Sequence, residues 1–484
     1  PFTEPVYVNI LAEPGGIGTE GTLPEFYGEP EAGMTDEQQQ RFENFKQFVK
    51  VASAEIRKLT PQVKIMMPWG DPVFAVPFLK DSETRQLFDG IAFDAGYFDR
   101  LPEQQFHQCS LHRMHQFMTH WKKHRQDKPF MISIEGPCLT RVAPGALTEE
   151  QFAAHMTRCA MILAAYGINR QFALTGSADP ASYWGEQHYG SGMFSRINGL
   201  NPRLACAAVG TMIRHLRHAE FVKWMPTGSL STYCLQFRDA RDGRTMHVIW
   251  TVRGTRQLTI AGRFQAYDSM DNLVSAPVIS QLPIYVYADA ENLTFGTPEH
   301  SDLTLAKDHI LLGHCTELFV RQNQEAEEQY LDAFPQAIRR FPAEMKLEKT
   351  AEGLAISLPG QETDRGVMPY YTTLHLENPL PIPGKAQYLT MEVTAASDWG
   401  RVVYVLRDGK GEKWISAGTP GTWNNDDTPN NSYFNFDGKR LLRFELPATL
   451  PWDNFREMGS TWWGASNGDQ IVDLPLSLEK IFIE

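Results

Sequence analysis

Two glutamates in the first third of the chain each follow a short apolar segment. Glu13 comes shortly after Val6–Leu11, and Glu135 comes directly after Phe130–Ile134. In barrels of parallel strands, the active site lies at the carboxyl ends of the strands. Two carboxylates on separate strands can supply the proton donor and the nucleophile that cleavage of a glycosidic bond requires. A retaining mechanism needs the two carboxyl groups about 5–5.5 Å apart, and an inverting mechanism needs a wider gap.

The elements that would position these glutamates are short strands alternating with amphipathic helices, a pattern typical of parallel βα units. Each strand is apolar and short enough to be buried on both faces. Five strands are predicted before residue 219: Val6–Leu11, Val63–Met67, Gly90–Asp94, Phe130–Ile134 and Gln171–Leu174. Two of the helices have capping-box starts, at Thr35–Gln38 and Thr148–Gln151. A last helix is predicted at about 202–217.

The hydrophobic pattern changes at about residue 220 to strands of period 2, which predicts all-β modules for the rest of the chain. Residues 220–300 predict a small β-sandwich, with strands such as Met246–Val252 and a turn at Asp242-Gly243. Residues 301–345 mix polar and acidic stretches and are predicted to be a connector. Residues 346–484 predict a larger β-sandwich with jelly-roll character. A chain of 484 residues is long enough for several domains.

The composition limits the classes of molecule that the protein is expected to bind. The net charge of -13 does not favour nucleic acid, because binding to phosphate backbones depends on basic patches. The apolar runs are far shorter than the roughly 20 residues of a membrane span, so no membrane partner is expected. Six scattered cysteines form no CxxC pair, and neither GxGxxG nor Walker A occurs, so no zinc, nucleotide or redox cofactor is expected. The 11 tryptophans could supply surfaces on which sugars stack.

The two glutamates and their strands resemble clan A of the glycoside hydrolases. In that clan one strand ends in Glu-Pro, as at Glu13-Pro14, and a later strand ends in Glu-Gly, as at Glu135-Gly136. The resemblance implies a (β/α)8 TIM barrel, with Glu13 after strand four as acid/base and Glu135 after strand seven as nucleophile. Residues 1–219 would then be strands four to eight, the C-terminal part of the catalytic barrel. The first half would lie on another chain, come from a homo-oligomer, or have been removed.

The same resemblance indicates residues that would bind a carbohydrate substrate. Asp94 and Tyr97 stand where the clan has a His-x-Tyr motif after strand six, whose tyrosine touches the nucleophile. Trp184 follows strand eight, where the clan often has an aromatic platform, and Trp69 follows strand five. Aromatic rings suit sugars because their faces pack against the C–H faces of the sugar ring. Ordinary packing at the barrel rim explains the two tryptophans almost as well.

Ala12 is a departure from the clan pattern, because an asparagine that holds the sugar 2-hydroxyl normally precedes the acid/base. This departure favours a second hypothesis, a non-catalytic glycan-binding protein on a glycosidase scaffold. A third hypothesis, an inverting hydrolase or lyase, would show a wider separation of the carboxylates. Another acid of the same Gly-rich stretch, Glu20, Glu25 or Glu29, could also act in place of Glu13.

The C-terminal module resembles galactose-binding-like accessory domains, on segments such as Gly400–Val402 and Tyr433–Asp437. The resemblance implies a carbohydrate-binding-module-like β-sandwich that either binds glycan or only packs. The run Asn424–Asp427 could ligate a structural calcium ion, although turn chemistry explains it equally well.

Histidines of the region after the third strand could in principle chelate a metal through His112 and His115. Such residues more often line a solvated helix face, so no metal site is assigned.

A plant or algal polysaccharide, or its oligosaccharides, is the expected substrate class. A polymeric substrate would place the protein outside the cytoplasm, secreted or periplasmic.

Overall fold

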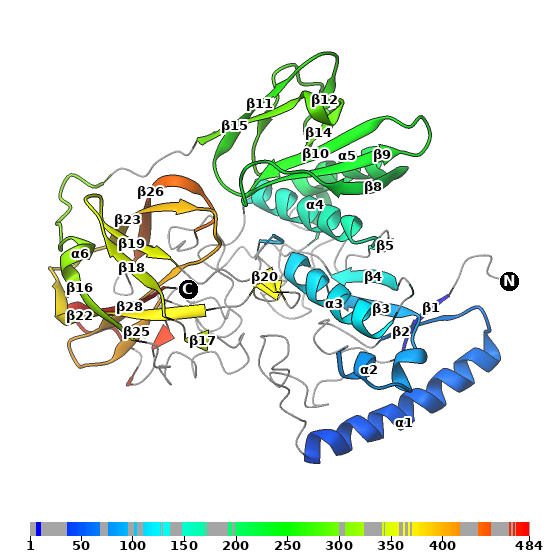
Figure 1. Ribbon diagram of the computed structural model, residues 1–484, viewed down its shortest axis with the longest axis horizontal. Helices are drawn as coiled ribbons and strands as arrows, with labels where there is room; N and C mark the ends of the chain where they lie inside the picture. Colours follow the sequence, from blue (N-terminus) through cyan, green and yellow to red (C-terminus); the bar gives the residue numbers. More distant parts are fainter. Residues whose placement is uncertain are drawn as a thin grey trace.

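The computed structural model describes residues 6–10, 36–67, 76–94, 101–103, 110–125, 127, 129–135, 148–168, 170–171, 192–195, 199–299, 305–323, 341–342, 344–357, 362–363, 366–367, 370–416, 434–446, 464–465, 468–469 and 471–483. Figure 1 shows a βα region near the N-terminus, a β-rich region in the middle of the chain, and a second β-rich region at the C-terminus. The fold is mixed, with many strands and few helices among these residues.

The βα region is built on a five-stranded sheet in which all strands are parallel and lie in chain order. Its strands are β1 (Tyr7–Asn9), β2 (Lys64–Met67), β3 (Gly90–Asp94), β4 (Phe130–Glu135) and β5 (Arg170–Gln171). The five strands expected from the hydrophobic pattern are therefore all present. Ile65 and Met67 pack among the helices, whereas Met66 is buried against Ala92. Ile65, Met66 and Met67 are therefore buried on both faces of the sheet, which explains why this part of β2 is apolar instead of alternating.

Helices cover this sheet, and their apolar faces share one core. They are α1 (Asp36–Leu59), α2 (Val76–Lys80), the short 3-10 helix η3 (Thr84–Gln86), α3 (Ser110–His124) and α4 (Glu149–Ala165). The capping box predicted at Thr148 is confirmed: its Oγ1 accepts a hydrogen bond from Gln151 N at 3.2 Å, and Gln151 Oε1 accepts one from Thr148 N at 2.8 Å. Such reciprocal bonds satisfy amide groups that the start of a helix otherwise leaves unpaired.

The middle β-rich region consists of two sheets packed face to face. The first sheet is β12 (Gln265–Tyr267), β14 (Ile284–Tyr287), β10 (Thr245–Thr251), β9 (Thr232–Asp239) and β8 (Ala219–Trp224), in that order. The second is β13 (Val278–Ile279), β11 (Thr255–Ile260) and β15 (Leu293–Glu299). Ile249 of β10 lies in the core between the sheets. Its neighbours Val248 and Trp250 face the other way, as the period of two requires.

Helices α4 and α5 (Leu204–Leu216) cover the outer face of the first sheet. Met161 and Ile162 of α4 pack with Val248 and Trp250, whereas Cys159 and Leu163 of the same helix belong to the core of the βα region. Figure 1 shows α4 between the parallel sheet and this β-sandwich. One helix therefore contributes to two hydrophobic cores.

The C-terminal region is a larger sheet faced by a two-stranded ribbon. The sheet contains β16 (Phe319–Asn323), β17 (Phe341–Pro342), β22 (Tyr370–Ile382), β24 (Val402–Arg407), β25 (Lys413–Ile415), β27 (Gly464–Ala465) and β28 (Leu476–Ile483). The ribbon is β23 (Tyr388–Ala396) with β26 (Asp437–Glu445), and Leu389 and Phe444 from it pack on Tyr404 and Leu478 of the sheet.

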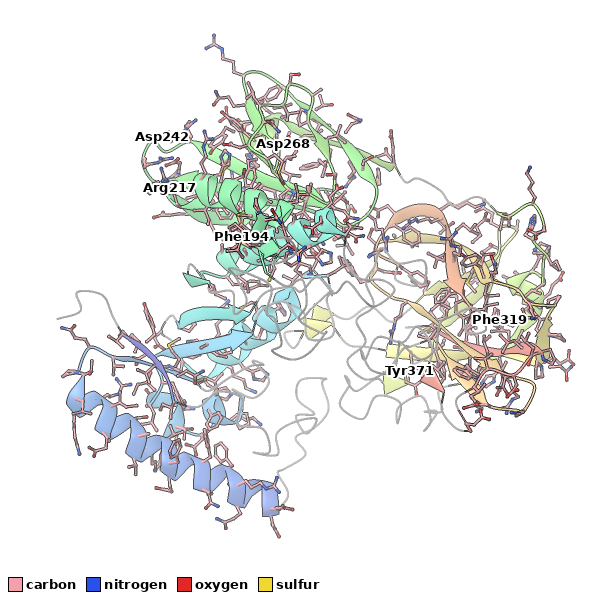
Figure 2. The ribbon with its side chains drawn as sticks, turned by 180° about the vertical axis from the view of Figure 1, so that it is seen from behind. Phe194, Arg217, Asp242, Asp268, Phe319 and Tyr371 are labelled. Atoms are coloured by element: carbon pink, nitrogen blue, oxygen red, sulfur yellow. The ribbon has the colours of Figure 1, made fainter. Side chains whose placement is uncertain are left out.

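Smaller elements complete this region: α6 (Cys315–Leu318), the hairpin β18 (Lys346–Lys349) with β19 (Leu354–Ser357), and the hairpin β20 (Glu362–Thr363) with β21 (Gly366–Val367). The strand β16, in the segment predicted to be a connector, pairs with β22, and Figure 2 shows Phe319 and Tyr371 of these two strands in the same module. Phe319 is buried there, although the strand ends in the polar run Arg321–Asn323. No helix among the described residues is long and apolar enough to cross a membrane.

Three buried histidines belong to α4, α5 and the middle sandwich. They are His155 on α4, His215 on α5 and His247 on β10. Burial lowers the pKa of His215 and of His247 from the usual 6.5 to about 4, and lowers that of His155 well below 6.5. His215 stacks on Tyr285 and its Nδ1 is 2.8 Å from the hydroxyl of Tyr287, so the neutral ring is held in place.

We expect the free energy of unfolding to fall as the pH drops from about 6.5 toward 4. In that range the unfolded chain binds protons that the folded histidines do not, and each histidine adds a slope of about 1.4 kcal/mol per pH unit. Above pH 6.5 the three residues contribute no slope. Urea denaturation at several pH values between 7.5 and 4.5 measures the free energy of unfolding. His155→Met should make its dependence on pH less steep, whereas His115→Gln, at an exposed position, should not. Equal slopes for the two variants would contradict the assignment.

Candidate active site

The carboxyl edge of the parallel sheet brings together two acidic residues that the sequence singled out. Asp94 is the last residue of β3 and Glu135 the last of β4, and the two are partners in the register of these strands. Neighbouring strands lie about 4.8 Å apart, so the two backbones are adjacent at this edge. Asp94 and Glu135 were expected at the ends of successive strands, and the structure places both there.

A register shift makes this pairing. Phe93 pairs with Ser133 and the next pair is Asp94 with Glu135, so Ile134 is an extra residue in β4. Without this bulge, Asp94 would stand beside apolar Ile134. Bulges are common next to active sites, where they redirect a side chain.

The other predicted site residues lie outside the described part of the chain. These are Glu13, Trp69, Tyr97 and Trp184. Glu13 follows Asn9, the last residue of β1, and β1 is separated from β4 by β2 and β3 in the sheet. The run Asn424–Asp427, considered for calcium, also lies outside the described residues.

A short segment on the way from β3 to α3 is fixed by a buried ion pair. The Glu103 carboxylate is fully buried and lies 2.8 Å from Nε of Arg158 on α4, which is also fully buried. The same carboxylate accepts a hydrogen bond of 2.7 Å from Nε1 of Trp250 on β10. Burial raises the pKa of Glu103, and the Arg158 charge offsets part of that rise. Leu111 at the start of α3 donates its amide to Pro102 O at 3.0 Å.

Sequence reasoning did not find the Glu103–Arg158 pair. The available signal was Arg158 itself, a charged residue inside the otherwise apolar stretch of α4. A buried arginine requires an acceptor, but the sequence does not say which acid supplies it.

Metal ligands do not cluster within the described ranges: no group of three or more His, Cys, Asp or Glu side chains there could hold a metal ion. His115 lies on α3 and is exposed, and the side chain of His112 is outside the described part.

No family model matches this chain, and no curated protein matches it by sequence. Among solved structures, a family 39 glycoside hydrolase from the gut symbiont Bacteroides cellulosilyticus WH2 is similar at 14% identity and a TM-score of 0.41, over 50% of this chain and 54% of that one. A β-porphyranase of glycoside hydrolase family 86 from Bacteroides plebeius is similar at 8% identity and a TM-score of 0.36, over 99% of this chain and 75% of that one.

A β-glucuronidase from Bacteroides uniformis is similar at 9% identity and a TM-score of 0.29, over 93% of this chain and 51% of that one. This chain therefore spans about half the length of the family 39 enzyme and of the β-glucuronidase. The three solved structures are all glycoside hydrolases, similar to this chain at 14% identity or less.

Proposed function

We propose that this chain carries the catalytic carboxylates of a retaining glycoside hydrolase, with Glu135 as nucleophile and Glu13 as acid/base. The observation that carries the proposal is the bulge in β4, which sets Glu135 level with Asp94 at the carboxyl edge of a parallel sheet. An edge of this kind is where barrel enzymes hold their catalytic side chains.

The order of the strands is compatible with the required separation of carboxyl groups. From β1 to β4 there are three strand spacings, or about 14 Å across a flat sheet. Side chains stand roughly perpendicular to a flat sheet, so a flat arrangement would leave the two carboxyl groups about as far apart as their strands. Curling of the sheet into a barrel would shorten this gap toward the value of about 5.5 Å that retaining enzymes use.

In the proposed reaction, Glu13 protonates the leaving oxygen while the Glu135 carboxylate attacks the anomeric carbon to form a glycosyl-enzyme. Glu13 then removes a proton from the water that hydrolyses this intermediate and regains its acid form. Asp94 and Tyr97 would bind sugar hydroxyls near the nucleophile, and Trp69 and Trp184 would stack on sugar rings. The reaction requires no cofactor.

A glycan-binding protein without catalysis is the second candidate, and Ala12 favours it.

A polymeric substrate would be met outside the cytoplasm, so a secreted or periplasmic location is part of the first proposal. The domain division at 219, 300 and 345, the jelly-roll character of the last domain and a barrel completed by another chain or copy also stay predictions.

Reducing-end release from a panel of plant and algal polysaccharides tests the proposal, followed by NMR of the first anomer formed. We expect hydrolysis with retained configuration. Inversion would instead make Glu135 a general base. Glycan binding by pull-down with no release of reducing ends would favour the non-catalytic alternative.

A further inference from the structure

The segment Leu101–Glu103 makes contacts with distant parts of the chain. It follows β3, whose last residue is Asp94, and leads to α3. Its Glu103 end is held by Arg158 and Trp250, which belong to α4 and the middle sandwich. The segment therefore already contacts two modules.

The C-terminal module reaches the other end of the same segment through Trp399. This side chain is 2% exposed and packs in one small cluster with Leu101 and Val252, with Tyr233 beside them. Its indole Nε1 donates to Leu230 O at 3.2 Å in the middle sandwich. Trp399 thus fills the space where the three modules meet.

The backbone around Trp399 has an uncommon conformation that its neighbours fix. Trp399 has φ of 63° and Ser397 has φ of 55°, values that non-glycine residues rarely adopt. The hydroxyl of Ser397 is 3.0 Å from that of Ser231 and 2.9 Å from Oδ1 of Asp437, and Trp399 N donates to Phe434 O. Strained residues of this kind persist where the surroundings over-determine them, and they cluster at functional sites.

The C-terminal module also makes a second contact with the βα region. The hairpin strand β21 of the C-terminal module lies against α3, and Figure 1 shows the small β20 arrow of this hairpin near that helix. The C-terminal module therefore meets both the segment before α3 and α3 itself.

We infer that Trp399 is a positioning residue for the candidate active site, because it holds in place the Leu101–Glu103 segment, which follows β3 in the chain. On this inference the C-terminal module is packed rigidly against the catalytic unit. It is not a glycan-binding domain joined to that unit by a flexible linker. The catalytic part of this inference rests on the proposed function, whereas the mechanical part does not.

Hydrogen exchange of the intact chain tests the mechanical part. The Leu111 amide, which donates to Pro102 O, reports on the segment. We expect Trp399→Ala to speed its exchange by about 10-fold, since local opening becomes easier, and Trp399→Phe to restore protection to within about 2-fold. Leu389→Ala is the matched control, because Leu389 is in the core of the C-terminal module and lies outside the Trp399 cluster.

Leu101→Ala removes the contact between Leu101 and Trp399 without changing a residue of the C-terminal core. If Trp399→Ala fails to fold, Leu101→Ala therefore shows whether this contact protects the segment. The double variant should exchange no faster than the faster single variant. Unchanged exchange in Leu101→Ala, or equal acceleration in Leu389→Ala, would overturn the inference.

Kinetics on a cleaved polysaccharide separate positioning from stability. Per folded molecule, Trp399→Ala should lower kcat by about 10-fold while KM stays within about 2-fold of the wild-type value. Trp399→Phe should recover most of the lost kcat. If wild-type protein cleaves no glycan, the proposed function fails, while the exchange result still decides whether Trp399 holds the segment.

Discussion

Under the proposed mechanism, Glu135→Gln should lower kcat by at least about 10³-fold, because an amide cannot form the covalent glycosyl-enzyme. This corresponds to about 4 kcal/mol of lost transition-state stabilisation. The change is nearly isosteric, and Glu135 ends a strand that is paired on both sides, so the fold should survive. Steady-state kinetics on the substrate found in the polysaccharide screen, together with a thermal unfolding curve, measure both effects.

Glu13→Ala gives the complementary result. An acid/base variant should keep activity toward aryl glycosides whose leaving group needs no protonation, and azide should rescue its slow second step. Glu150→Gln is the matched control, since Glu150 is exposed on the first turn of α4. Full activity in Glu135→Gln would remove Glu135 from the mechanism, and a Glu13→Ala variant that behaves as wild type would direct attention to Glu20, Glu25 or Glu29.

Glu103→Leu is expected to cost about 3–5 kcal/mol of unfolding free energy, because it leaves the Arg158 guanidinium buried without its counter-charge. Trp250 Nε1 loses its acceptor in the same variant. Arg158→Met should cost less, since burial already raises the pKa of Glu103 and the orphaned carboxyl group can take up a proton. The stability that Arg158→Met loses relative to wild type should therefore be smaller at pH 5 than at pH 8.

Urea denaturation of the two single variants and of the double variant measures this asymmetry. The double variant Glu103→Leu/Arg158→Met should be more stable than Glu103→Leu alone, because no charge is then left unpaired. Glu348→Ala is the control, since its exposed pair with Lys346 should contribute less than about 1 kcal/mol. A Glu103→Leu cost as small as that of the control would mean that water reaches Arg158.

The parts of the fold that the sequence predicts are those set by local pattern. The five parallel strands follow from short apolar runs, and the start of α4 follows from the Thr148 and Gln151 capping box. Asp94 and Glu135 were found because they stand where such a strand ends. Local spacing is enough for these features, since strand burial and helix capping act over a few residues.

What the sequence did not predict depends on contacts between distant residues. The bulge at Ile134 arises from pairing between β3 and β4, and no composition rule marks it. Glu103 meets Arg158 and Trp250 only in the folded chain, and Trp399 meets Leu101 across two modules. The strand β16 is stabilised by its pairing with β22, although its own sequence is polar enough to predict a connector.

The shared position of α4 has a consequence for how the molecule loses structure. Because this helix supplies Cys159 and Leu163 to one core and Met161 and Ile162 to the other, neither core is complete without it. The boundary at residue 219 thus separates two sequence patterns but not two units of cooperative unfolding. A protease that cleaved near that boundary would leave fragments bound to each other, and the βα sheet and the middle sandwich would melt as one.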